Sequence, residues 1–200
     1  MTEGTLAAPL VSLLLGYLLG SIPFGILLTR LAGAGDLRSV GSGNIGATNV
    51  LRTGRKGLAA LTLVLDALKG TAAVLITAAI GGDPSIAAAA AVIGHMYPVW
   101  LRFRGGKGVA TVVGVLIGLH PPAAAVYAIV WLAMLAITRY SSVAGITAAL
   151  VAPVAVAWFG RFDLTLLFLG LALLVFWKHR GNVDRLLSGT EPRVGRSANG

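Results

Sequence analysis

The sequence contains no cysteine, few charged residues and few aromatic residues. The absence of cysteine excludes disulfides, thiolate metal sites and cysteine nucleophiles. Only 12% of the residues are charged, against roughly a quarter in soluble domains. The three histidines have no carboxylate cluster beside them, so we expect neither a metal site nor a bound cofactor.

The sequence is instead rich in apolar residues. They make up 56% of the chain, and the mean hydropathy is +0.86. Most segments must therefore face lipid or one another, which predicts an all-α integral membrane protein. The length of 200 residues has room for a single membrane-embedded domain over residues 1–200, with a flexible tail expected from about 189 to 200.

Seven apolar segments are candidates for transmembrane helices. A span needs about 20 apolar residues, and the fourth segment is shorter, which by length alone favours a re-entrant or broken helix. The candidates are Leu6–Leu31, Gly57–Gly81, Ser85–Leu101, Val109–Leu119, Ala123–Thr138, Ser142–Phe159 and Leu164–Trp177.

The basic residues decide between these alternatives. The net charge of +9 does not indicate a nucleic-acid partner, because the cations lie in short runs between apolar segments without interleaved aromatics. With seven crossings and the N-terminus outside, the connections on the inner side hold 14 of the 16 lysines and arginines, as the positive-inside rule requires. We therefore expect a C-terminus in the cytoplasm, with Arg161 outside and Lys69 within the membrane.

A glycine-rich polar segment at Gly41–Arg52 follows the first apolar segment. Glycines let the backbone approach a ligand closely, and successive N–H groups in such a turn can hold an anion. Neutral donors and a guanidinium suited to phosphate lie among these glycines: Ser42, Asn44, Thr48, Asn49 and Arg52. The alternative is a flexible polar loop.

A second polar segment, Phe103–Thr111, combines glycines with Lys107 just before a helix. It lacks the spacing of a Walker A motif, but a helix N-terminus that faces inward would attract an anion. His95 lies upstream within the third apolar segment, where a histidine is either a packing residue or a participant in the chemistry.

The third polar segment, Lys178–Glu191, follows the last apolar segment. It contains His179 and Asp184 at the spacing that one acyltransferase superfamily uses for a general base and its partner. A helix would not place residues five apart on one face, so we prefer Asn182 and Arg185 as ligand contacts.

Asp66 and Lys69 lie inside the second apolar segment. At a spacing of three they share a helix face and can neutralise each other. Ionisable residues at such depth usually face a bundle interior or a wet cavity. A structural ion pair and a substrate contact both remain open.

Five stretches carry a resemblance to a known family: GSIPFG at Gly20–Gly25, SGNIGATNVLRTGRKG at Ser42–Gly57, DALKG at Asp66–Gly70, GHMYPVWLRFRGGKGVAT at Gly94–Thr111 and HRGNVDRLLSGTE at His179–Glu191. In this order they resemble the PlsY family of bacterial glycerol-3-phosphate acyltransferases, over nearly the whole chain. The resemblance implies seven helices in the inner membrane with three cytoplasmic motifs. It also implies transfer from an acyl phosphate, rather than from a thioester, to make lysophosphatidic acid.

The resemblance and the residues together give the candidate site. We expect catalytic roles for Ser42, Arg52, His95, Lys107 and Asn182. We expect contacts to substrate phosphate from Asn44, Thr48, Asn49, Gly105, Gly106, Gly108, Thr111, Arg185 and Glu191. The expected partners are acyl phosphate, glycerol 3-phosphate, the bilayer and, as the family implies, a soluble enzyme that makes the acyl phosphate.

These residues predict direct attack of the glycerol 1-hydroxyl on the acyl carbonyl, because a mixed anhydride is already activated and Ser42 lacks an evident partner base. The proton goes either to a substrate phosphate or to His95. An organic-anion transporter is the alternative from another class, but the polar segments gather on one side of the membrane. A non-catalytic scaffold leaves the three phosphate-type segments unexplained.

Overall fold

The computed structural model describes residues 4–195, and the chain is entirely helical wherever it is regular in that range. It divides into two compact units, one up to Pro121 and the other from Pro122 onward, where the sequence predicted a single domain. Each unit is described by itself. The first unit contains α1 (Gly4–Gly20), α2 (Phe24–Leu31), η1 (Leu37–Ser39), α3 (Ala47–Leu51), α4 (Lys56–Ala79), α5 (Pro84–Met96), η2 (Val99–Leu101) and α6 (Val109–Leu119).

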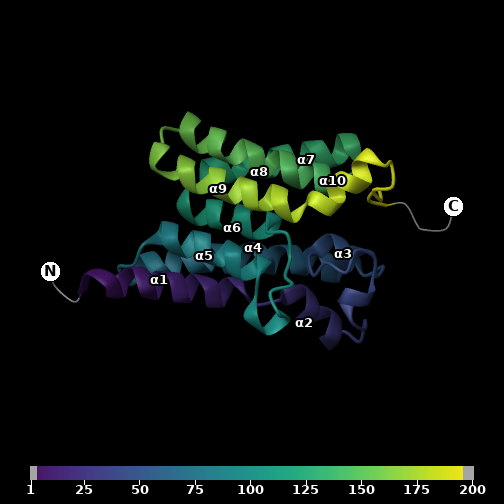
Figure 1. Cartoon of the computed structure of the whole chain (residues 1–200), viewed down its shortest axis with the longest axis horizontal. Coiled ribbons are helices and arrows are strands. Elements are labelled where there is room, and N and C mark those ends of the chain that lie inside the picture. The colour runs from purple at the N-terminus through teal and green to yellow at the C-terminus, as the bar shows by residue number, and fades with distance from the viewer. Residues whose placement is uncertain (1–3, 196–200) are drawn as a thin grey trace. The chain divides into compact units, whose positions relative to one another are not determined.

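Small residues bring the helices of the first unit together. Helix α1 lies along α5, and α4 lies along α6 (Figure 1). A side chain at Gly16 or Gly20 would collide with the backbone of α5, and one at Gly114 would collide with the backbone of Ala67 in α4. Such close approach is how helices associate in lipid, where burial of apolar surface gives no driving force. Gly16, Gly20 and Gly114 therefore serve helix packing within this unit.

The first apolar segment is broken near its end. Helix α1 stops at Gly20, and α2 begins after Pro23, which cannot donate a backbone hydrogen bond. The break leaves the carbonyl of Ile22 available to the Lys69 ammonium, 2.7 Å away. The turn between α1 and α2 thus supplies an acceptor inside the unit.

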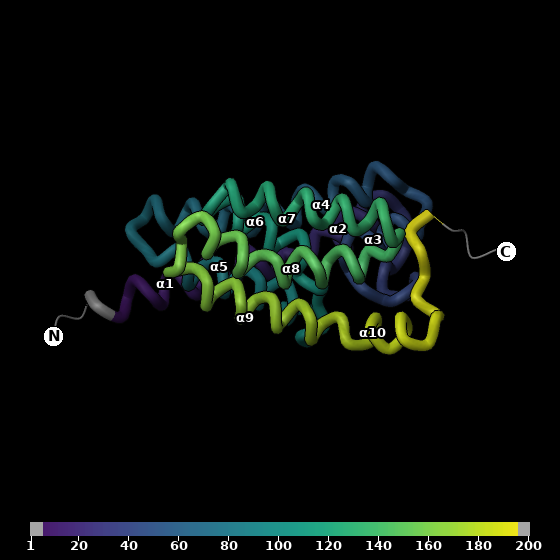
Figure 2. Tube along the Cα trace, turned by 90° about the horizontal axis from the view of Figure 1, so that it is seen from above, coloured from purple at the N-terminus to yellow at the C-terminus, as the bar shows by residue number. Residues whose placement is uncertain are grey.

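The second unit contains α7 (Pro121–Thr138), which begins at the boundary, α8 (Ser141–Trp158), α9 (Phe162–Lys178) and α10 (Arg180–Leu187). Helices α8 and α9 lie side by side, and the chain bends by 55° between α9 and α10 (Figure 2). Alanines form the buried face of α8, while Phe168, Leu171 and Val175 are buried on α9.

After α10 the chain returns to the start of α8. The backbone N–H of Val194 donates to the Arg139 carbonyl at 2.8 Å, and the Arg193 guanidinium lies over the Tyr140 ring. Arg193 and Val194 thus contact the start of α8, and the flexible tail expected from about residue 189 remains a prediction. The remainder of that expected tail, residues 196–200, lies outside the described part of the chain.

Within residues 4–195, five apolar stretches are long enough to cross a membrane: Leu6–Leu31, Lys56–Ala79, Pro84–Leu101, Pro121–Thr138 and Ser141–Trp158. The bent pair of α9 and α10 makes a sixth if it counts as one span. Helix α6 has 11 residues and matches the short fourth segment that the sequence singled out. Seven crossings with an external N-terminus remain a prediction.

Candidate active site

The Gly41 loop, residues 40–46, is a compact turn rather than a flexible connection. Gly41 and Gly43 have φ of 53° and 67°, in the left-handed region that favours glycine. The Gly43 N–H donates to the Val40 carbonyl at 2.9 Å, and the Gly46 N–H donates to Asn44 Oδ1 at 2.9 Å. The loop is therefore shaped by its own backbone before any ligand binds.

The Asn49 side chain fixes this loop through hydrogen bonds. Its Nδ2 donates to the carbonyls of Leu37 at 3.0 Å and Val40 at 2.9 Å. Its Oδ1 accepts, at 3.3 Å each, from the Ser42 N–H and from a guanidinium nitrogen of Arg52. The side chain is buried, with 2% exposed. Asn49 was expected to bind phosphate, but the protein already uses both ends of its amide, so the structure indicates a role in positioning the loop.

The residues that Asn49 positions lie at the surface. Ser42 and Arg52 are exposed, and Asn44 and Thr48 are half-buried. The Arg52 side chain lies against Gly41, where a Cβ would come within 2.8 Å of its nitrogen. The expected ligands Ser42, on the Gly41 loop, and Arg52, at the end of α3, are thus brought together by Asn49 and are exposed, and Asn44 lies on the same loop as Ser42.

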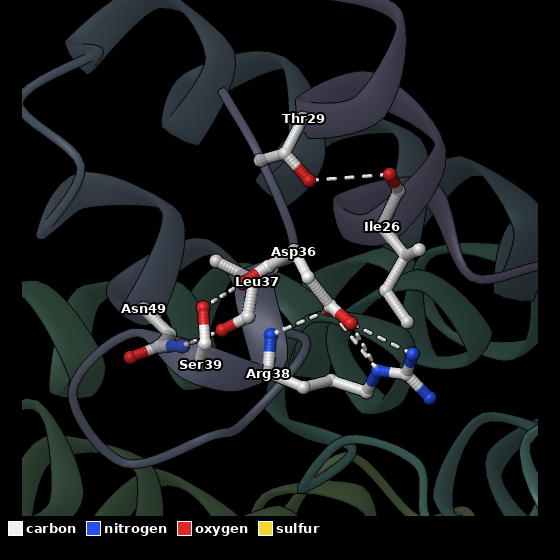
Figure 3. A network of polar contacts seen from close by, with 7 residues as sticks. All are labelled: Ile26, Thr29, Asp36, Leu37, Arg38, Ser39 and Asn49. Carbon is white, nitrogen blue, oxygen red and sulfur yellow. Dashed lines mark hydrogen bonds and ion pairs between the residues drawn. The ribbon is translucent and has the colours of Figure 1, made fainter. Parts of the chain in front are cut away.

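The segment before the Gly41 loop contains a second polar network (Figure 3). Arg38 donates from its side chain and its backbone to Asp36, with an ion-pair distance of 2.8 Å. These bonds lower the pKa of Asp36 to about 2. Leu37 is fully buried in a small apolar cluster with Val50 and Ala59. This cluster places the Leu37 carbonyl where Asn49 can donate to it.

The phosphate loop, defined here as Gly105–Gly108, is attached to the end of α5. The N–H groups of Gly105 and Gly106 donate to the carbonyls of Met96 at 3.1 Å and His95 at 3.0 Å. Both amides were expected to contact phosphate directly, but the structure uses them to fasten the loop. Gly108 has a φ of 87° and caps α6. Lys107 is half-buried between two buried glycines.

Thr111 lies in the first turn of α6 and is fully buried. Its hydroxyl has no hydrogen-bond partner among the described residues. Because the side chain is closed off from solvent, the phosphate contact that the sequence suggested for Thr111 is not formed at the surface of the loop.

His95 forms part of a buried ionic cluster with Asp66 and Lys69. The Lys69 ammonium lies 2.8 Å from Asp66 Oδ1 and 2.9 Å from His95 Nδ1. An ammonium has only donors, so Nδ1 of His95 must accept and carries no proton. In a neutral ring the proton then lies on Nε2, which makes this ring a donor instead of a base. The structure therefore favours the packing alternative for His95.

In the second unit, a buried carboxylate gathers three residues; we call Glu191, Ser142, Asn182 and Arg185 the Glu191 cluster. Glu191 Oε1 accepts from Ser142 Oγ at 2.7 Å and from Asn182 Nδ2 at 2.6 Å. Oε2 accepts from Arg185 Nε at 2.8 Å. Burial raises the pKa of Glu191, but the three hydrogen bonds outweigh it and hold the pKa below its ordinary value.

This arrangement changes the expected role of Glu191. An ionised carboxylate would repel a phosphate, and its oxygens already accept three hydrogen bonds. Glu191 instead orients Asn182 and Arg185, which the sequence predicted as ligand contacts and which the structure does bring together. Ser142 was missed, because a lone serine at the start of an apolar helix gives no signal that distinguishes it from an ordinary helix residue.

His179 was set aside in the sequence because its supposed partner, Asp184, falls on another face. The structure leaves Asp184 exposed but buries His179. His179 Nδ1 lies 2.8 Å from the Val175 carbonyl, so Nδ1 carries a proton and, in a neutral ring, Nε2 is the acceptor. The Asn182 N–H donates to the His179 carbonyl at 2.7 Å. His179 therefore belongs with Asn182 in the candidate site.

These features define the class of protein: a multi-span helical membrane protein whose loops present cations and amide donors to anionic ligands. Known proteins place it further. The profile of the family described as "Glycerol-3-phosphate acyltransferase" matches residues 10–189. The chain is 61% identical over 188 residues to the glycerol-3-phosphate acyltransferase of Rhodopseudomonas palustris strain BisB5, covering 93% of this chain and 96% of that one. It is 57% identical over 196 residues to the Mesorhizobium japonicum enzyme, covering 98% of both.

Solved structures agree with the sequences. The fold is similar to the crystal structure of PlsY, an integral membrane glycerol 3-phosphate acyltransferase, in its glycerol 3-phosphate form. The TM-score is 0.88 and the identity 40%, over 94% of this chain and 96% of the other. The lysophosphatidic acid form of PlsY gives a TM-score of 0.87 and 38% identity, with the same coverage. The chain thus belongs to the PlsY-type family of glycerol-3-phosphate acyltransferases, and it is a multi-pass integral membrane enzyme.

Proposed function

We propose that the enzyme transfers an acyl group from an acyl phosphate to the 1-hydroxyl of sn-glycerol 3-phosphate, the first acylation of phospholipid synthesis. The products are lysophosphatidic acid and inorganic phosphate. The related PlsY structures, in glycerol 3-phosphate and lysophosphatidic acid forms, support the acceptor and the product. The donor is inferred from the family resemblance of the motifs.

One structural observation supports the proposal most strongly. In each unit a buried side chain holds an arginine and an N–H donor in position. Asn49 fixes Arg52 and the Gly41 loop, and Glu191 fixes Asn182 and Arg185. Two phosphorylated substrates repel each other, so donors already in position are needed to bring them to reacting distance. Arg52 and Lys107 in the first unit, and Arg185 in the second, each offer positive charge to a phosphate.

Direct transfer is the chemistry that the residues support. The glycerol hydroxyl oxygen attacks the acyl carbonyl carbon, the bond from that carbon to the phosphate oxygen breaks, and the phosphate leaves with the electron pair. The hydroxyl proton passes to a substrate phosphate. Within residues 4–195 the Ser42 hydroxyl has no base bound to it, and His95 Nδ1 is occupied by Lys69. A covalent acyl-serine would need such a base.

The donor is tested by incubating purified protein with labelled glycerol 3-phosphate and either palmitoyl phosphate or palmitoyl-CoA. Labelled lysophosphatidic acid formed from palmitoyl phosphate alone supports the proposal, whereas product from palmitoyl-CoA alone overturns the donor. Arg52→Gln should lose activity, while Arg38→Gln, whose cation is already paired with Asp36, is the matched control. Recovery of an acylated Ser42 in the absence of glycerol 3-phosphate would contradict direct transfer.

We further propose seven spans in the bacterial inner membrane, with the N-terminus outside and the polar loops in the cytoplasm. The distribution of basic residues supports this orientation. Because the chain has no cysteine, single cysteines give a clean test in intact cells. A membrane-impermeant maleimide should label Phe162→Cys, at the start of α9, and should leave Lys56→Cys, at the start of α4, unlabelled until the cells are opened. The reverse pattern would invert the topology.

A further inference from the structure

Lys69, in the middle of α4, is buried more deeply than any cation that the proposed chemistry uses. The side chains of Lys69 and Asp66 are 2% and 4% exposed, and their charged atoms are 2.8 Å apart. Ionisable groups at such depth in a membrane protein are costly and usually functional. A buried ion pair is also weak evidence for stability, since apolar residues of similar volume often do as well.

Lys69 connects three segments that are distant in sequence. Its ammonium lies close to Asp66 on its own helix, to the carbonyl of Ile22 at the α1–α2 break at 2.7 Å, and to Nδ1 of His95 near the end of α5 at 2.9 Å. The ammonium thus hydrogen-bonds the Ile22 carbonyl and His95 Nδ1 and forms an ion pair with Asp66. Asp66 compensates the charge, and the other two contacts fix the break and the His95 ring.

His95 is in turn the support of the phosphate loop. Its carbonyl accepts from the Gly106 N–H at 3.0 Å. Its ring packs against Gly106 so closely that a Cβ there would collide with Nε2. The next residue, Met96, holds Gly105 through its carbonyl and packs its methyl group against Gly108. The orientation of the His95 ring therefore sets the path of the backbone on both sides of Lys107.

We propose that Lys69, with Asp66 as its counterion, is a positioning residue that acts through His95 to hold the phosphate loop in the shape that binds the phosphate monoester of a substrate. This inference rests on the proposed function of the loop in phosphate binding. It assigns no proton transfer to His95. The chemistry recognised is a phosphate group, carried either by glycerol 3-phosphate or by the acyl phosphate.

The test separates positioning from stability and from proton transfer. In the double variant Asp66→Leu with Lys69→Met, apolar residues of similar size replace the pair, so the helix keeps its packing. In His95→Asn, an amide oxygen takes the place of Nδ1 and still accepts from Lys69, whereas His95→Leu removes that acceptor. Thr77→Val is the control, because Thr77 is a buried residue of the same helix whose hydroxyl has no partner among the described residues.

The readouts are kcat and KM for each substrate and equilibrium binding of labelled glycerol 3-phosphate. For the double variant and His95→Leu we expect the KM of one phosphorylated substrate to rise about 10- to 100-fold, the range that displaced positioning groups produce, while kcat changes much less. His95→Asn and Thr77→Val should stay close to wild type. The substrate whose KM rises identifies which phosphate the loop holds.

Two results would overturn the inference. A folded double variant with wild-type KM values for both substrates and wild-type binding would reduce the pair to a stability element. Equal loss of kcat in His95→Asn and His95→Leu, with unchanged KM, would make His95 a proton carrier. An error in the proposed donor would show separately, because the wild-type protein would then not turn over palmitoyl phosphate. The affinities of wild type and variants for glycerol 3-phosphate could still be compared in that case.

Discussion

Replacement of Glu191 by alanine is the perturbation whose size follows most directly from the structure. The carboxylate accepts hydrogen bonds from Ser142, Asn182 and Arg185 at 2.6–2.8 Å. Alanine removes all three acceptor contacts at once and leaves the donors in place. The prediction is therefore a loss of stability in the second unit together with disordering of the Asn182 and Arg185 side chains.

The magnitude depends on how deeply each donor is buried. Ser142 and Asn182 are 2% and 7% exposed, and a buried donor that loses its acceptor costs about 1–3 kcal/mol. Arg185 has 38% of its side chain exposed, so water screens its loss and the contribution is about 0–1 kcal/mol. We expect a total of about 2–7 kcal/mol. For a chain of this size a central loss of about 4 kcal/mol lowers Tm by roughly 8–16 °C.

The assay is thermal unfolding of the purified protein in detergent, with Asp184→Ala as the control. Asp184 lies on the same helix as Asn182 but is exposed, so its loss should stay within about 0.5 kcal/mol. Glu191→Gln keeps the oxygen that accepts from Asn182 and turns an amide toward Arg185, so an intermediate loss is expected. Equal stability of Glu191→Ala and Asp184→Ala would refute the reasoning.

The pH dependence of stability tests the role of Glu191 independently. The three bonds hold the pKa of folded Glu191 below its ordinary value. Its contribution is therefore fully present above the unfolded-state pKa of about 4.3 and is lost as the pH falls through the lower folded pKa. Wild type should lose stability toward acid more steeply than Glu191→Gln. Parallel acid curves for the two proteins would contradict this.

Three further predictions concern the first unit. Asn49→Leu should lower kcat/KM by at least about tenfold, because the Gly41 loop and Arg52 lose the side chain that positions them. An unchanged kcat/KM would disprove this role of Asn49. Gly41→Ala places a side chain at a φ of 53° against Arg52, so the KM for a phosphorylated substrate should rise in steady-state assays. Gly114→Ala forces α6 away from α4 and should cost about 1–3 kcal/mol in thermal unfolding, whereas Gly57→Ala, which meets open space, should not.

The sequence predicted the helices well and the interruptions less well. Six of the seven apolar segments begin and end within a few residues of single helices or of a helix with its terminal turn, and Val109–Leu119 coincides with α6. Hydropathy has this power because a backbone in lipid must satisfy its hydrogen bonds within a helix. The break at Ile22 stayed hidden within one apolar segment, and the partner of its carbonyl, the Lys69 ammonium, comes from a distant part of the chain.

The candidate site was predicted as a set of residues but not as a set of roles. Asn49 and Glu191 stood out with the ligands because they share the same short motifs, yet both are buried and bind protein. The sequence shows which side chains can donate or accept hydrogen bonds, whereas the fold decides which partner each side chain binds. His95 is the clearest case, since its ring could serve as base or support until the position of Lys69 fixed its donor and acceptor nitrogens.

The placement of the acidic residues explains why an excess of positive charge remains available to anionic substrates. Of the six acidic residues between 4 and 195, four form ion pairs close to their own position or at a helix end: Asp36, Asp66, Asp163 and Glu191. A fifth, Asp83, accepts from the first turn of α5. The carboxylates are thus committed to local structure, where a neighbouring cation or helix N-terminus offsets their charge. A phosphate that approaches the loops therefore meets a chain of net charge +9 whose carboxylates are largely neutralised by local partners. Among the arginines and lysines between residues 4 and 195, Lys69 alone is buried.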